Sequence, residues 1–264
     1  MRVESKGFTL IEMVVTIVIG SIIVLGIAGY VQVGVKGFVD ANSRQRIQTQ
    51  AQFVLEKLSR EIRHAVPNSF RITSSGGSEC LEFVPTYNSG YYFEKPGTSN
   101  LLFVTGEQVP GGTIKSAENL RLVINPTRYE DLFDSPAGTS PTSWNSFAID
   151  SDLPIQTNDG EGNAQYYSFA LPLPLASQSI AARIYLYKPD SVIRYCIVQP
   201  VLPSDSGLLT RNGVTVENIE SSQSAFNYTN TGLQLGGIVY LKFAFKQNDE
   251  VSVYQQDVQV LNVP

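Results

Sequence analysis

The sequence has few of the residues that catalytic and metal sites use. It contains one histidine, His64, and two cysteines without a C-x-x-C pair, so we expect no zinc site. No P-loop and no G-x-S-x-G motif occurs, and Gly160-Glu161-Gly162 lacks the rest of a dinucleotide fingerprint. His64 falls on the exposed side of a predicted helix, where a surface histidine is more common than a general base. We therefore predict no enzyme, no catalytic residue, no cofactor and no bound metal.

Charge is also scarce, and neither sign dominates. Charged residues make up 16% of the chain, with 19 basic and 24 acidic residues and a net charge of −5. This balance lacks the basic footprint of a nucleic-acid-binding protein, so we predict no nucleic-acid partner. Asn158-Asp159-Gly160-Glu161 offers oxygen ligands for calcium, but its spacing differs from an EF-hand loop and favours a solvated turn.

One stretch near the N-terminus, residues 13–35, carries no charge at all. As a helix it is roughly 34 Å long, which matches the hydrocarbon core of a bilayer. Glu12 precedes it directly, and a carboxylate inside a membrane costs on the order of 2.5 kcal/mol or more, so it requires a partner. A secretory signal peptide cut near Gly29 is one alternative, but the apolar run is too long for it. A simple membrane anchor is another, and it gives no reason for Glu12.

The junction Lys6-Gly7-Phe8-Thr9-Leu10-Ile11-Glu12, followed by this apolar run, resembles the leader junction of type IV pilins and type II secretion pseudopilins. The resemblance implies a leader at 1–7, cleavage between Gly7 and Phe8 by prepilin peptidase, and methylation of the Phe8 amine. It implies an assembly role for Glu12. The implied product is a structural subunit whose partners are other pilin subunits, packed through the N-terminal helix.

The resemblance also implies a location and leaves two functions open. The chain would cross the inner membrane once, with its C-terminal domain in the periplasm and, after assembly, in the extracellular pilus. The downstream helix, the overall length and the closing residues 255–264 further resemble minor pilins of the MSHA-type pilus system. The alternative is a membrane-anchored periplasmic binding or adhesion module of a secretion pseudopilus. An aromatic groove would favour this alternative, and its candidate residues are Tyr91, Tyr92, Trp144, Tyr166 and Tyr167.

Beyond the apolar run, the pattern predicts that the same helix continues to about Val66. We expect a transmembrane half at 8–37 and an amphipathic half at 38–66, closed by Pro67-Asn68. Glycines within the first half indicate either close helix packing or a stretch that melts during assembly. One face of the second half is apolar at helical spacing, at Ile47, Ala51, Val54, Leu55, Leu58, Ile62 and Ala65.

From Ser69 onward the period changes to two, which predicts an α+β protein. The long N-terminal helix would pack on a C-terminal antiparallel sheet within residues 69–264, with the inner face of the sheet on the apolar stripe. Residues 188–191 and 247–250 are predicted hairpin turns. The expected strands are 69–73, 80–85, 90–94, 101–105, 119–125, 164–171, 182–188, 191–199, 213–219, 237–246 and 250–261.

Two further features complete the expected domain. Residues 126–163 are polar and aperiodic, which predicts a long loop insertion, anchored by Trp144 and Phe147, that contributes few core contacts. Cys80 and Cys196 each lie in a predicted strand. In the periplasm an even cysteine count favours a disulfide between them, and two buried free thiols are the alternative.

Overall fold

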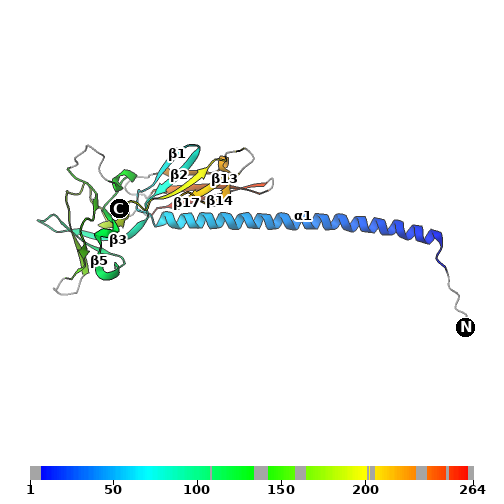
Figure 1. Cartoon of the computed structure of the whole chain (residues 1–264), viewed down its shortest axis with the longest axis horizontal. Coiled ribbons are helices and arrows are strands. Elements are labelled where there is room, and N and C mark those ends of the chain that lie inside the picture. Colours follow the sequence, from blue (N-terminus) through cyan, green and yellow to red (C-terminus); the bar gives the residue numbers. More distant parts are fainter. Residues whose placement is uncertain are drawn as a thin grey trace, which may run out of the picture. The chain divides into compact units, whose positions relative to one another are not determined.

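The chain consists of one long helix and a β-rich domain, which confirms the predicted α+β class (Figure 1). It divides into two compact units, Met1–Thr49 and Gln50–Pro264, which we describe separately. The helix α1 (Leu10–Arg63) is unbroken over 54 residues and lies within the predicted range of Phe8 to Val66. The computed structural model describes residues 7–107, 109–133, 142–157, 165–200, 202, 206–229, 237–247 and 250–260.

The first unit contains the exposed, apolar part of α1. Its most apolar window has a mean hydropathy of 2.6 and none of it is buried, so α1 is long and apolar enough to cross a membrane. Its hydroxyl groups bond to the helix itself: Thr16 Oγ1 donates to the Met13 carbonyl at 2.9 Å and Ser21 Oγ to the Ile17 carbonyl at 2.7 Å. Polar side chains satisfied in this way are compatible with lipid.

The apolar stripe of α1 is buried as predicted, at all seven positions from Ile47 to Ala65. In the second unit the helix contacts a five-stranded antiparallel sheet. Glu61 of α1 receives hydrogen bonds from Tyr195 and Arg211, which lie on two neighbouring strands of this sheet. The strand order of this sheet is β1 (Arg71–Ser75), β2 (Ser78–Phe83), β12 (Ile193–Val198), β13 (Gly207–Arg211) and β14 (Val214–Ile219).

A disulfide joins Cys80 and Cys196, as predicted. The two residues lie directly opposite each other on β2 and β12, with their Cα atoms 4.0 Å apart. The bridge spans 116 positions of sequence and therefore restricts the unfolded chain. On the chain-entropy model, this restriction stabilises the folded state by at most about 5 kcal/mol. The disulfide therefore joins two neighbouring strands that lie far apart in sequence.

The second large sheet has seven strands and its own core. Leu101, Phe103, Tyr167, Phe169 and Ile184 are among the buried residues of that core, none of which lies on α1. Its strand order is β7 (Ser146–Ala148), β6 (Arg121–Val123), β11 (Arg183–Tyr187), β3 (Thr86–Glu94), β4 (Asn100–Thr105), β10 (Gln165–Ala170) and β9 (Gln156–Thr157).

The prediction of one sheet on the helix is therefore wrong. The apolar stripe of α1 is one helix face wide, whereas the strands divide into several sheets that bury different inner faces. Two smaller sheets complete the fold: β15 (Ala225–Thr229), β16 (Ile238–Gln247) and β17 (Glu250–Gln259) form one, and β5 (Thr113–Ile114) pairs with β8 (Leu153–Pro154) in the other. Short 3₁₀ helices are η1 (Pro110–Gly112), η2 (Ser116–Glu118), η3 (Tyr129–Leu132) and η4 (Ser221–Gln223).

Of the two predicted hairpin turns, one joins paired strands and the other does not. Strands β16 and β17 pair antiparallel up to Gln247 and Glu250, with the turn residues 248 and 249 outside the described residues. Between β11 and β12, Ser191 N donates to the Lys188 carbonyl at 3.1 Å, so the turn exists. These strands belong to different sheets, because β11 pairs with β3 and β6 while β12 pairs with β2 and β13. The prediction of a hairpin there is wrong.

The described parts of the segment 126–163, which are 126–133 and 142–157, contribute to the core. Phe147 and Ile149 are each 3% exposed and belong to the core of the seven-stranded sheet. The segment also supplies three of the strands, β7, β8 and β9. The prediction of few core contacts is wrong, because strands of two or three residues are too short to show a period of two.

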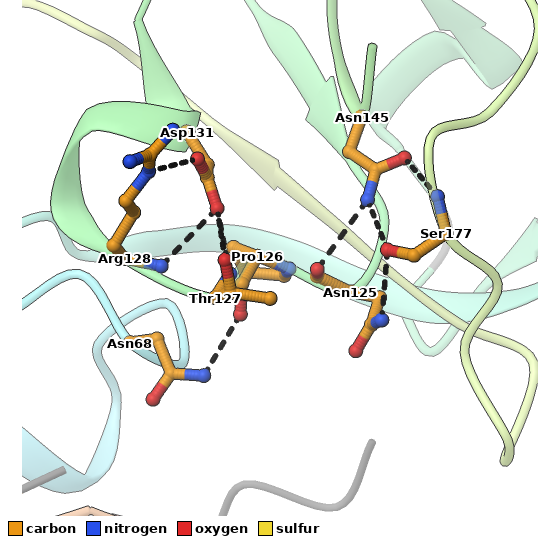
Figure 2. Close-up of polar contacts among 8 residues, drawn as sticks. All are labelled: Asn68, Asn125, Pro126, Thr127, Arg128, Asp131, Asn145 and Ser177. Carbon is orange, nitrogen blue, oxygen red and sulfur yellow. Dashed lines mark hydrogen bonds and ion pairs between the residues drawn. The ribbon is translucent and has the colours of Figure 1, made fainter. Parts of the chain in front are cut away.

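Polar side chains hold this segment in place (Figure 2). Asn145 Oδ1 accepts hydrogen bonds from the backbone N–H of Ala176 at 2.9 Å and of Ser177 at 3.1 Å. Asp131 accepts from the backbone N–H and hydroxyl of Thr127 at 2.9 and 2.6 Å, and from Arg128 Nε at 2.9 Å. Asparagine and aspartate groups thereby replace the ladder hydrogen bonds that a longer strand would make.

Candidate processing and assembly site

The junction Gly7-Phe8 lies outside regular secondary structure, just before the first turn of α1. The Phe8 side chain is 72% exposed, and no atom lies within 4 Å of the position that a Cβ on Gly7 would occupy. The backbone here is therefore open to an enzyme that approaches the peptide bond between Gly7 and Phe8. Lys6 and the rest of the leader, residues 1–6, lie outside the described residues.

Thr9 and Glu12 form a reciprocal cap at the start of α1. Thr9 Oγ1 accepts a hydrogen bond from the Glu12 backbone N–H at 3.4 Å. In return, Glu12 Oε2 accepts from the Thr9 backbone N–H at 3.4 Å and from the Thr9 hydroxyl at 3.3 Å. A threonine followed three positions later by a glutamate is the sequence signature of a capping box. Sequence analysis gave Thr9 no role, although this spacing was available to find it.

This cap gives Glu12 a role within the subunit. A helix begins with four backbone N–H groups that have no partner inside the helix, and a negative charge there also complements the helix dipole. Only Oε2 takes part in the cap, and within the described residues Oε1 has no hydrogen-bond partner. Glu12 can therefore cap its own helix and still present an oxygen to a second donor.

The apolar helix surface that follows is uncovered by the chain itself. Leu10 is 83% exposed and Leu25 73% exposed, and residues 13–35 contain no charge. An apolar surface of this length is stable only against lipid or against other apolar helices. Glu12 and Lys36 mark its two ends.

The aromatic residues considered for a groove are divided between two faces of the seven-stranded sheet. Tyr91 and Tyr166 line the open face of a groove of about 510 Å³, and Tyr92, whose ring packs against the core on the other face, borders it. Tyr167 is instead 2% exposed within the core, and Trp144 packs against that same core. The expected groove therefore exists with three of its five predicted members.

The remaining candidates are His64, a possible metal site and the possible calcium turn. His64 is exposed and follows the last residue of α1, Arg63, instead of lying on the helix. In the described part of the chain no three His, Cys, Asp or Glu side chains come together as a metal site. The possible calcium turn at 158–161 lies outside the described residues.

Comparison with known proteins identifies the N-terminal segment. Residues 4–28 match a family described as the prokaryotic N-terminal methylation motif. No curated protein and no solved structure matches the chain. The match covers the junction, the capping pair and the first part of the apolar helix, and it indicates a prepilin of the type IV pilin-like class, processed by a peptidase.

Proposed function

We propose that this chain is a minor pilin or pseudopilin, a structural subunit that is cut between Gly7 and Phe8 and methylated on the Phe8 amine. The observation that carries the proposal is the methylation motif at residues 4–28, whose acidic residue, Glu12, lies in the first turn of α1, directly before the exposed apolar half of the helix. In this role the helix anchors the subunit in the inner membrane, with the β-rich domain in the periplasm, until the subunit enters a fibre.

Assembly would use the charge of Glu12. Cleavage leaves a positively charged amine on Phe8, at the edge of the membrane. Opposite charges attract strongly in a medium of low dielectric constant, and a buried charge without a partner costs several kcal/mol. Oε1 of Glu12, which takes no part in the cap, favours a neighbouring subunit whose Phe8 amine lies at the same level, and this pairing would set the axial offset between subunits.

Within the pilin-like class we favour a minor subunit of an MSHA-type pilus. Support comes from the overall length and from the closing residues 255–264, which resemble those of such subunits. Pili sheared from the cells should then contain the chain in small amounts relative to the main subunit. Recovery of the chain only from the inner membrane would instead favour the pseudopilus alternative.

Cleavage is tested by mass spectrometry of the intact chain from cells with and without prepilin peptidase. We expect an N-methylated Phe8 start only when the peptidase is present. The variant Gly7→Val should keep its leader because the bulky side chain blocks the cleaved bond, whereas the matched variant Gly20→Val, within the helix, should be processed. A Met1 start in the presence of the peptidase, or a cut near Gly29, would contradict the proposal.

A further inference from the structure

The outer face of the seven-stranded sheet carries exposed aromatic rings in adjacent rows. Tyr91 on β3 lies opposite Val104 on β4, and Phe93 lies opposite Leu102. Tyr91 is 53% exposed, Phe93 59% and Val104 41%. Because alternate residues of a strand point to opposite faces, Tyr92 between them points the other way. The result is a continuous apolar platform instead of single scattered side chains.

The platform is the floor of a groove. Tyr166 of β10 and Lys95, which follows β3, line it together with Tyr91, Phe93, Leu102 and Val104. Its volume of about 510 Å³ is within the range of roughly 300–1,000 Å³ found for ligand sites. Neither β3 nor β4 is an edge strand, since β3 lies between β11 and β4 and β4 lies between β3 and β10. The rings are thus held on the interior strands of the sheet.

The layer beneath makes the platform rigid. Phe103 and Tyr167 stack below it with their ring centroids 5.3 Å apart. The Tyr92 hydroxyl accepts a hydrogen bond from the Ser179 backbone N–H at 3.0 Å, which fixes the start of the segment before β11. Exposed rings on such a fixed support lose little conformational entropy when a ligand stacks on them.

The charged side chain that lines the groove is that of Lys95, and Arg183 lies next to Tyr91, in a chain whose net charge is −5. The Arg183 guanidinium lies 5.4 Å from the centre of the Tyr91 ring and also interacts with the Tyr185 hydroxyl, while its Nε is buried. Lys95 forms no ion pair with any described residue and is exposed. The nearest acid in sequence, Glu94, accepts a hydrogen bond from Gln178 at 3.0 Å. These charges suit an anionic partner.

We propose that this groove binds an acidic polysaccharide, with sugar rings stacked on Tyr91 and Phe93 and sugar carboxylates beside Lys95, while Arg183, next to the Tyr91 ring, adds positive charge at the border of the groove. A sugar ring presents C–H groups on its faces and hydroxyl groups at its edge, which suits an aromatic floor with polar and cationic surroundings. A single nucleic-acid strand also stacks on aromatic rings, but it brings one phosphate per nucleotide and calls for a longer basic groove. The proposal is independent of the assignment as a pilin.

The test measures binding of the intact chain in detergent micelles to alginate oligosaccharides, which are polyuronates. Neutral dextran and oligothymidylate serve as comparison ligands. The variants Tyr91→Ala and Phe93→Ala remove the stacking floor, and Lys95→Gln removes one charge. Tyr240→Ala is the matched control, because this tyrosine is 36% exposed on a different sheet, in β16. Circular dichroism checks that every variant retains its fold.

We expect alginate binding that falls about tenfold or more in each aromatic variant and is unchanged in Tyr240→Ala. Lys95→Gln should weaken binding and reduce its dependence on salt, because it removes a screened charge contact. Full binding in the folded aromatic variants, equal binding of dextran, or tighter binding of oligothymidylate would each overturn the proposal. Self-association of the chain that is lost in the aromatic variants, without alginate binding, would show that a second copy covers this face and would overturn it too.

Discussion

Glu61 of the helix and Arg211 of β13 form an ion pair, with Glu61 Oε2 3.0 Å from Arg211 Nε. The same oxygen accepts a hydrogen bond from the Tyr195 hydroxyl at 3.2 Å. Burial, followed by the neighbouring Glu61 carboxylate, raises the pKa of Tyr195 above its ordinary value, so the hydroxyl remains a donor. One carboxylate thus joins the amphipathic half of α1 to two adjacent strands of the five-stranded sheet.

Loss of this carboxylate should destabilise the domain. For Glu61→Ala we expect the free energy of unfolding to fall by about 1–2 kcal/mol, because Arg211 and Tyr195 lose a charged partner and Arg211 stays partly solvated. Urea unfolding followed by the fluorescence of Trp144, the only tryptophan, measures this change. Glu56→Ala, at an exposed position of the same helix, should change stability by less than about 0.5 kcal/mol. Equal effects in the two variants would mean that the ion pair contributes nothing.

Phe147 should contribute strongly to the core of the seven-stranded sheet. Its side chain is 3% exposed and its ring centroid lies 6.2 Å from that of Phe169. Phe147→Ala should lower the free energy of unfolding by about 3–5 kcal/mol, through lost burial and the cavity left behind. Phe53→Ala, at a position 61% exposed, is the control and should have little effect on unfolding in urea. Deletion of 126–163 should prevent folding, and a well-folded deletion variant would show that this segment is dispensable.

Asp152 should make the stability of the domain depend on pH below about 4. The Ser116 backbone N–H, then the Lys115 amine and the Ser116 hydroxyl, lower the pKa of Asp152 to about 2. A carboxyl with a lowered pKa in the folded state stabilises that state above its unfolded pKa, near 3.9, and loses this contribution as the pH falls to about 2.

The melting temperature of the unmodified chain should therefore exceed that of Asp152→Asn above about pH 4, and the difference should shrink between about pH 4 and 2. Near-ultraviolet circular dichroism across this range gives both curves. Asp190→Asn, in the exposed turn after β11, is the comparison variant for loss of a surface carboxylate. A difference between the chain and Asp152→Asn that stays constant down to pH 2 would exclude this carboxylate as the titrating group.

Two substitutions of Glu12 should separate its capping role from a role of its charge. Glutamine at this position can still complete the capping box with Thr9, whereas alanine cannot. If the charge pairs subunits, Glu12→Gln and Glu12→Ala should both enter fibres poorly while remaining cleaved and inserted in the membrane. Immunoblotting of sheared fibres and of membranes measures both steps. Normal incorporation of Glu12→Gln together with poor incorporation of Glu12→Ala would mean that the cap, and not the charge, is what assembly requires.

The sequence alone determined the features that depend on neighbours along the chain. The apolar run is a continuous stretch without charge, whereas the stripe from Ile47 to Ala65 repeats every three or four residues, and all seven stripe positions are buried. Each of the eleven predicted strands overlaps an observed one. The pairing of Thr9 with Glu12 is also local, within one helical turn, so its spacing carried the signal for a cap that the sequence analysis did not predict.

Only the tertiary structure decided which strands share a sheet. Strands β11 and β12 follow one another in sequence but pair in different sheets, with strands that lie elsewhere in the chain. The same pairing places Tyr166 in the groove and buries Tyr167, since neighbouring residues of a strand point to opposite faces and only the assembled core determines which face is inside. Phe147 is buried for the same reason: its three-residue strand carries no period of its own, and its place beside β6 depends on contacts far away in sequence.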